Sequence, residues 1–203
     1  MIIKVCGMRD EENIRQLELL DIDWMGFIFY SGSSRYVGQK VNYLPEKVKK
    51  IGVFVDQNPQ IIRERVIQNH LDVIQLHGSE PPSYCLNLLE EGFKVIKSFG
   101  IDADGFIPNA QLNAYEGKCN YFLFDTKTKL HGGSGKRFNW EKLANYDGDT
   151  PFILSGGISP EDAEEIKSFK HPKFAGIDIN SRFEIEPAYK DIEMIKSFIK
   201  QIR

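Results

Sequence analysis

The chain has 203 residues, of which 41% are hydrophobic and 27% charged, a composition typical of a folded domain and not of a disordered segment. Its net charge of −3 argues against nucleic acid as a partner, because nucleic-acid surfaces carry a basic excess, but it leaves room for a small anionic substrate. No signal peptide is recognisable, and no apolar run reaches the roughly 18 residues of a membrane span, so we expect no membrane contact. Three cysteines suit a reducing cytoplasm better than a disulfide framework.

Short apolar runs rich in Ile, Val and Phe recur along the chain. They span Ile2–Cys6, Trp24–Phe29, Ile51–Val55, Val73–Leu76, Lys94–Lys97, Tyr121–Phe124, Pro151–Leu154 and Phe174–Ile179. The runs are mostly continuous and not alternating, which is typical of strands that are buried on both faces, as in parallel sheets. The pattern therefore predicts eight buried strands.

Helix-start signals lie between several of these runs. Asp10, Asn58 and Ser159 each precede a segment with helical periodicity, and Pro59 and Pro160 stand at the first helical positions. The stretch 100–118 has little periodicity and predicts a short or degenerate fifth helix.

The last helix is expected to open at Pro187. Its apolar residues recur at helical spacing and are expected to pack against the core, not against a partner. They are Ile192, Ile195, Ile199 and Ile202.

Eight strand–helix units in about 200 residues can form an open doubly wound sheet or a closed barrel. An open sheet usually carries its glycine-rich turn after the first strand, whereas here the glycine-rich turns follow the sixth and seventh runs. Barrels bind phosphate near strands 7 and 8. We therefore expect residues 1–203 to form a single (β/α)8 TIM barrel of the ribulose-phosphate-binding type.

Two side chains at strand ends could carry chemistry, since barrel active sites lie where strands end. Cys6 ends the first run, and it can act as a base or nucleophile where a nearby cation favours its thiolate. A buried structural cysteine is the alternative interpretation. Asp125 ends the sixth run and can act as a general acid, or simply cap a turn.

The ends of the seventh and eighth runs predict a phosphate site. Gly156 and Gly157 expose backbone amides that can bind an anion, although an ordinary tight turn has the same sequence. Asp178, Asn180 and Ser181 close the neighbouring run, and together the two ends match the usual barrel phosphate site.

Three further features are candidates for the pocket. Arg35 offers a planar donor fork for a substrate carboxylate, and His77 ends the fourth run; either could instead be structural or solvated. The loop 132–136, with Gly133 and Gly135, could cover an anion, or be a bland flexible loop. The histidines and cysteines lack metal-ligand spacing, and no dinucleotide fingerprint follows the first run, so we expect no metal and no cofactor.

Six short segments occur in a characteristic order and spacing over nearly the whole chain. They are Lys4-Val5-Cys6-Gly7-Met8, Ser34-Arg35-Tyr36-Val37, Gly52-Val53-Phe54-Val55, Leu71-Asp72-Val73-Ile74-Gln75-Leu76-His77-Gly78, Gly132-Gly133-Ser134-Gly135-Lys136 and Ser155-Gly156-Gly157-Ile158. Together they resemble the phosphoribosylanthranilate isomerase family of tryptophan biosynthesis. The resemblance implies an Amadori rearrangement of a phosphorylated aminosugar on a (β/α)8 barrel. The outer helices give no clear seam, so the sequence leaves open whether the chain is a monomer or a homodimer.

The resemblance also implies roles for individual residues. Cys6 would match the family's general base, Asp125 its general acid and Arg35 its carboxylate-binding residue. The phosphate-binding loops would contain Gly156, Gly157, Asn180 and Ser181, the loop 132–136 would be the mobile cover, and Asp178 would match a family aspartate of open role.

The chain departs from the family pattern after strand 8. Asn180 stands where serine is usual, Arg182-Phe183 replaces a glycine and a small apolar residue, and Pro187-Ala188 replaces Pro-Gly. These departures bear on the strand-8 loop and not on Cys6 or Asp125. Two other functions stay open: an isomerase for another aminosugar phosphate, and a non-catalytic barrel that binds a phosphorylated metabolite.

Overall fold

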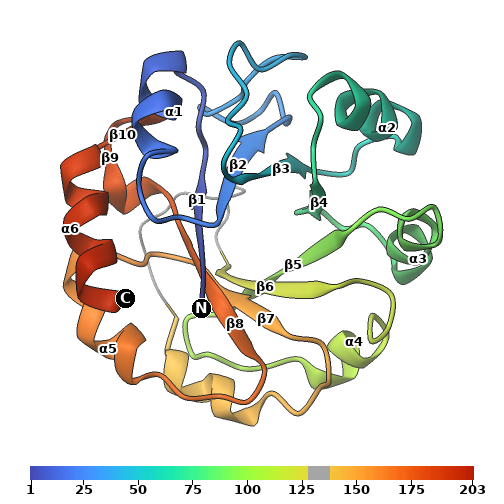
Figure 1. Ribbon diagram of the computed structural model, residues 1–203. Helices are drawn as coiled ribbons and strands as arrows, with labels where there is room; N and C mark the ends of the chain where they lie inside the picture. Colours follow the sequence, from blue (N-terminus) through green and yellow to red (C-terminus); the bar gives the residue numbers. More distant parts are fainter. Residues whose placement is uncertain (128–137) are drawn as a thin grey trace.

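Eight parallel strands close into a barrel in the computed structural model, in the order of the chain, with β1 paired to both β2 and β8 (Figure 1). The structure describes residues 1–127 and 138–203. The barrel strands are β1 Ile2–Cys6, β2 Trp24–Ile28, β3 Lys49–Phe54, β4 Val73–Leu76, β5 Val95–Ile101, β6 Tyr121–Thr126, β7 Phe152–Leu154 and β8 Phe174–Ile179. The predicted (β/α)8 barrel is confirmed.

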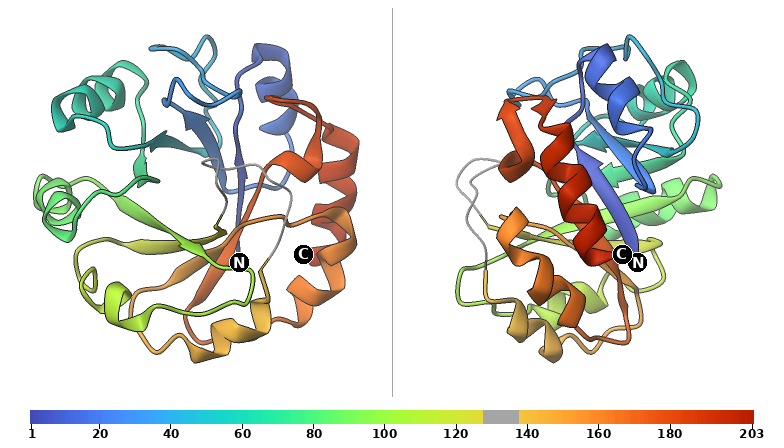
Figure 2. Two further views of the ribbon diagram at one scale, coloured as in Figure 1. Left: turned by 180° about the vertical axis from the view of Figure 1, so that it is seen from behind. Right: turned by 60° about the vertical axis from the view of Figure 1, so that its left-hand side comes forward.

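Helices pack around the outside of the barrel (Figure 2). The α-helices are α1 Glu11–Leu17, α2 Pro59–Gln68, α3 Pro82–Glu90, α4 Asn109–Asn113, α5 Ala163–Ser168 and α6 Ile192–Ile202, and the 3₁₀ turns are η1 Trp140–Asn145, η2 Pro160–Asp162 and η3 Ser181–Phe183. The predicted starts are confirmed at Asp10, whose side chain accepts from Asn13 N, and at Asn58, which accepts from Gln60 N. Ser159 and Asp162 form a capping box before α5.

The helical layer is less regular than the strands. The fifth connection holds only the five-residue α4, as expected from its weak periodicity. The described residues 29–48, between β2 and β3, contain no helix at all, which the sequence did not indicate.

The expected start of the last helix at Pro187 is wrong. Pro187 lies in a short hairpin between β9 (Glu184–Glu186) and β10 (Tyr189–Lys190), and α6 starts after Asp191, whose side chain accepts from Met194 N. Asp191 is the better cap because its carboxylate satisfies a free backbone N–H of the first turn. The apolar stripe is buried as expected at Ile195, Ile199 and Ile202.

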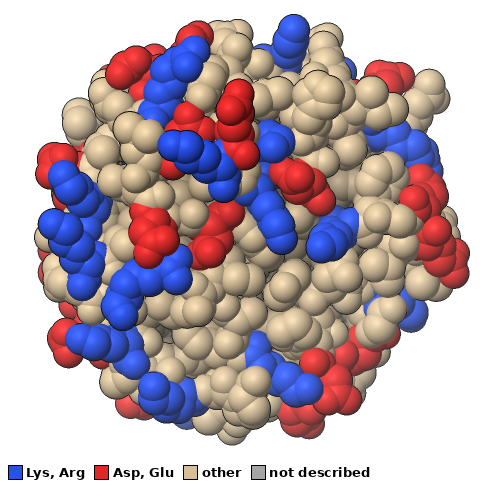
Figure 3. Space-filling model, viewed as in Figure 1, with Lys and Arg blue, Asp and Glu red and all other residues tan. Residues whose placement is uncertain are grey.

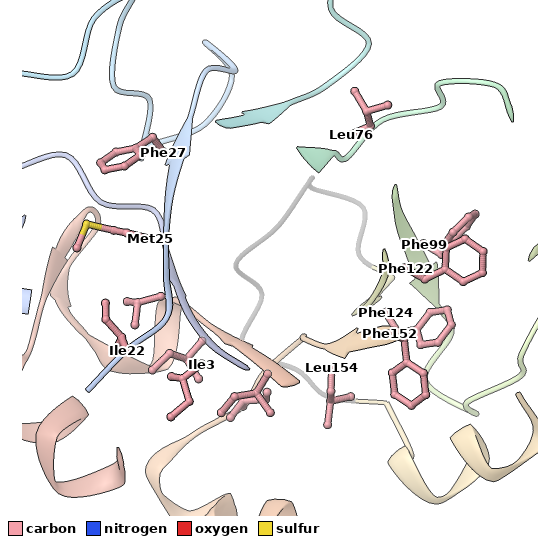
Figure 4. Packing of buried hydrophobic residues seen from close by; sticks show 14 of the residues in the cluster. Ile3, Ile22, Met25, Phe27, Leu76, Phe99, Phe122, Phe124, Phe152 and Leu154 are labelled. Atoms are coloured by element: carbon pink, nitrogen blue, oxygen red, sulfur yellow. The ribbon is translucent and has the colours of Figure 1, made fainter. Parts of the chain in front are cut away.

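Two apolar layers sandwich the sheet. The larger fills the space between strands and helices, and Figure 4 shows part of it, including Phe99, Phe122, Phe124 and Phe152 packed around β5 to β7. The smaller lies inside the barrel and consists of Trp24, Ile51, Val73, Ile96, Leu123 and Ile153. Because side chains alternate along a strand, the residue two positions after each of these points inward again, one layer nearer the carboxyl ends.

The surface gives two further findings. No helix among the described residues is long and apolar enough to cross a membrane. On the face seen in Figure 3, basic and acidic side chains are interspersed and do not gather into one field of a single sign.

Candidate active site

Above the inner apolar layer, the barrel interior becomes polar. Lys4 and Cys6 lie two residues apart on β1 and point to the same side, and Lys4 pairs in register with Asp178 of β8. The Lys4 Nζ lies 2.9 Å from Asp178 Oδ1, and neither side chain is more than 6% exposed. Cys6 and Asp178 were predicted as site residues from the sequence, and the structure brings them together around Lys4. Lys4 itself was not among the predicted site residues.

The Cys6 thiol is almost fully enclosed, at 4% exposure. Burial raises its pKa, because the thiolate loses hydration, while the positive charges of Lys4 and Lys190 oppose that rise. Cys85 and Cys119 are also buried free thiols, but they lie on the helix side of the sheet, in the outer apolar layer. Cys6 is therefore the cysteine at the mouth of the barrel.

Asp178 lies within electrostatic range of both predicted catalytic residues. Burial raises the pKa of this carboxyl, and Lys4 opposes that rise; the charge of Asp125 raises it further. Asp178 also acts electrostatically on Cys6. Ser155 Oγ donates to Asp178 Oδ2 at 3.4 Å. Cys6, Asp178 and Asp125 thus belong to one polar cluster at the carboxyl ends of β1, β8 and β6.

Asp125 lies opposite His77, across the barrel mouth from β1. Its side chain is 18% exposed, and Oδ2 is 3.4 Å from His77 Nε2. On the other side of the imidazole, Gln75 Nε2 is 3.0 Å from His77 Nδ1, and if it donates there the ring proton is held on Nε2, facing Asp125. The predicted pocket residue His77 therefore lies beside the predicted acid.

Gly156 packs directly against the end of β6. Its φ is +86°, and a Cβ there would collide with the backbone N of Thr126 and lie 2.8 Å from Asp125 Oδ1. Only glycine tolerates both conditions. A glycine is therefore needed at position 156 to leave room for Asp125, whether or not an anion binds to the backbone of this loop.

A cavity of about 490 Å³ lies between the segments that follow β7 and β8; Gly157 is the predicted phosphate residue that lines it, and the carboxylates Glu161 and Asp162 line it too. Gly157, with φ of +72°, contributes from the loop after β7, and Arg182 of η3 contributes from the loop after β8. Ser181 opens η3. Asn180 is different, because its Oδ1 accepts a 2.7 Å hydrogen bond from Lys190 and so is not free for a ligand.

Arg35 is held by a carboxylate of the protein itself. Glu184 accepts from Arg35 Nε at 2.9 Å and from Nη2 at 2.6 Å, a bidentate pair in which Glu184 is 4% exposed. Lys190 donates at 2.6 Å to Oε1, the same Glu184 oxygen that accepts from Arg35 Nε. The remaining guanidinium edge is the part of Arg35 that could meet a substrate carboxylate.

Lys4, Glu184 and Lys190 are the residues that sequence reasoning missed. Lys4 carried a signal, since a lysine inside the run Ile2–Cys6 must enter the barrel interior or the apolar outer layer. Glu184 enters the site by pairing with Arg35, 149 positions away, and Lys190 enters it by pairing with Glu184, so local sequence did not reveal either role. Gly133, Gly135 and the rest of the loop 132–136 lie outside the described residues.

Metal ligation finds no support in the described part of the chain, where no group of three or more His, Cys, Asp or Glu side chains could hold an ion.

Comparison with known proteins gives a consistent result. A model of the N-(5'-phosphoribosyl)anthranilate isomerase family matches residues 3–201. The isomerase of that name from Parabacteroides distasonis is 49% identical and covers 100% of this chain and 93% of its own. A crystal structure of phosphoribosyl anthranilate isomerase from Thermotoga maritima has a TM-score of 0.82 at 32% identity, covering 100% of this chain and 98% of its own. Another, with the same coverage, 28% identity and a TM-score of 0.79, is a complex with reduced 1-(o-carboxyphenylamino)-1-deoxyribulose 5-phosphate.

Proposed function

This chain belongs to the N-(5'-phosphoribosyl)anthranilate isomerase family, and we propose that it performs the family's Amadori rearrangement with Cys6 as general base and Asp125 as general acid. The chain is thus an isomerase of tryptophan biosynthesis. It converts N-(5-phosphoribosyl)anthranilate to 1-(2-carboxyphenylamino)-1-deoxyribulose 5-phosphate. The supporting observation is the polar cluster in which Asp178 interacts with both Cys6 and Asp125.

The reaction needs an acid first and a base second. Asp125 gives a proton to the ribose ring oxygen, the ring opens, and the anthranilate nitrogen becomes part of a Schiff base. Cys6, as thiolate, then removes the proton from C2′, and the resulting enolamine tautomerises to the ketone. Strands β1 and β6 lie well apart around the ring of eight, which leaves room for the sugar between base and acid.

Anchors at both ends would orient the sugar. The phosphate is assigned to the loops after β7 and β8, through Gly156, Gly157 and the backbone of Asn180 and Ser181. The anthranilate carboxylate is assigned to the free edge of Arg35, whose other edge is held by Glu184. Fixing both ends removes rotational freedom before reaction, an effect worth several kcal/mol of barrier in general.

Two substitutions test the assignment of base and acid. Cys6→Ala and Asp125→Asn should each lower kcat by about a hundredfold or more, as loss of a general acid or base does. The assay follows the loss of anthranilate-substrate fluorescence. Cys85→Ala is the matched control, because Cys85 is an equally buried cysteine on the helix side of the barrel. Near-normal turnover in either site variant would remove that residue from the mechanism.

Arg35 separates this function from the alternative of another aminosugar phosphate. If a substrate carboxylate binds Arg35, Arg35→Ala should raise KM for the anthranilate compound by about tenfold or more. That factor corresponds to the binding free energy of one or two charge-assisted hydrogen bonds. An unaltered KM would favour a different substrate. Tight binding of the compound by the wild-type chain without turnover would favour a non-catalytic binder.

A further inference from the structure

We propose that Lys4 is the positioning residue that enables Cys6 to work as a base: its ammonium, anchored by Asp178, stabilises the Cys6 thiolate. This inference rests on the proposed function of Cys6. Lys4 is fully buried, and burial of its ammonium costs free energy unless opposite charges lie around it.

The Lys4 ammonium and the Cys6 thiol border one small space inside the barrel. Gly26 of β2 is the register partner of Cys6. A Cβ on Gly26 would lie 2.7 Å from Cys6 Sγ and 3.2 Å from Lys4 Nζ. Both atoms thus line the same small space inside the barrel, and the absence of a side chain at position 26 leaves that space open between them.

Asp178 holds the ammonium in this position. Its Oδ1 is 2.9 Å from Lys4 Nζ, and the two residues are register partners on adjacent strands. The carboxylate also keeps Lys4 charged: burial disfavours the ammonium, but Asp178 and Cys6 outweigh it and the pKa of Lys4 is raised. Lys4 is therefore a fixed cation and not a proton acceptor.

Three cations act electrostatically on the thiol: Lys4, Arg35 and Lys190. Lys4 pairs with Asp178, whereas Arg35 and Lys190 share Glu184. With Asp125 as the third carboxylate, the cluster has no excess of cations. Stabilisation of a thiolate therefore depends on the nearness of Lys4 and not on the net charge of the site.

Burial works in the opposite direction and raises the pKa of Cys6. Among the opposing interactions, Lys4 is the largest, ahead of Lys190. Removing Lys4 should therefore raise the pKa of the Cys6 thiol further and leave less thiolate at a given pH. The expected loss falls on proton abstraction and not on substrate binding.

The test is an ultraviolet titration of the full-length chain, with the spectrum of a Cys6→Ser variant subtracted so that only the Cys6 thiolate contributes. Lys4→Met should raise the thiol pKa by at least about one unit and lower kcat by about tenfold or more, with KM changed less than about twofold. Lys4→Arg, which keeps a cation, should bring both the thiol pKa and kcat part of the way back to the wild-type values.

Lys97→Met is the matched control. Lys97 is likewise a buried barrel lysine paired with a carboxylate, Glu80 at 3.0 Å, but it acts on Cys85 and Cys119 and lies on the outer side of β5. The Lys97→Met substitution should leave the measured pKa of the Cys6 thiol unchanged. An equal shift in Lys97→Met would mean that loss of any buried lysine disturbs the thiol, and would overturn the proposal.

A second variant keeps the test decisive if Lys4→Met fails to fold with Asp178 unpaired. Lys4→Met/Asp178→Asn removes both charges, and because Lys4 has the larger effect on the thiol, its pKa should still rise. A thiol pKa unchanged from wild type in a folded variant overturns the role of Lys4. Full activity of Cys6→Ala would instead overturn the proposed function, so the two failures are distinguishable.

Discussion

Lys190 should make the free energy of unfolding rise with pH in the alkaline range. The side chain is completely buried and donates to Glu184 and Asn180. Burial nevertheless lowers the pKa of Lys190 from 10.5 to about 8, with Glu184 opposing the shift. Between these two values the unfolded chain keeps the proton and the folded chain releases it, so stability increases as the pH rises.

The size of this effect follows from the depressed pKa. Below pH 8 the folded chain bears the full cost of a buried ammonium, about 3 kcal/mol for a shift of this order. From pH 8 to pH 9 the folded lysine loses most of its proton, which recovers about 1 kcal/mol. Cysteines with raised pKa values act in the opposite direction there, so the wild-type curve alone does not isolate Lys190.

The assay is therefore a difference between proteins. Urea unfolding of wild type and Lys190→Met is measured across this range, and the difference in unfolding free energy should increase by about 1 kcal/mol between pH 8 and pH 9 in favour of wild type. A level or falling difference for Lys190→Met would refute the reasoning.

Three other substitutions have defined outcomes. Glu184→Gln leaves Lys190 and Arg35 without their carboxylate. It should lower the free energy of unfolding in urea by about 3–5 kcal/mol and raise KM. An unchanged free energy of unfolding would contradict a buried ion pair at Glu184. Gly156→Ala should cut kcat at least about tenfold by crowding Asp125, whereas Gly117→Ala, with a similar positive φ but open space, should lose only stability, about 1–2 kcal/mol. His70→Gly should stabilise the chain by about 0.5–1 kcal/mol, seen as a higher Tm, because exposed His70 has a φ of +46° at the end of α2; a lower Tm would count against it.

Much of the fold was predictable because its signals are local. Continuous apolar runs of four to six residues mark strands that are buried on both faces, and caps such as Asp10 and Asn58 mark helix starts. The hairpin at Pro187 was not predictable from such signals. Its β10 strand is held to α1 by Asn13, which bonds to both the N and O of Lys190, a contact across 177 positions.

The candidates Cys6, Asp125 and Gly156 could be found from the sequence because each stands where an apolar run ends or just after it. The order of the runs and their ends are read directly along the chain, and barrel sites lie at those ends. The ion pairs around those candidates became visible in three dimensions: Lys4 meets Asp178 across 174 positions and Arg35 meets Glu184 across 149. Ion pairs depend on distance and burial in space, which closure of the barrel creates and local sequence does not encode.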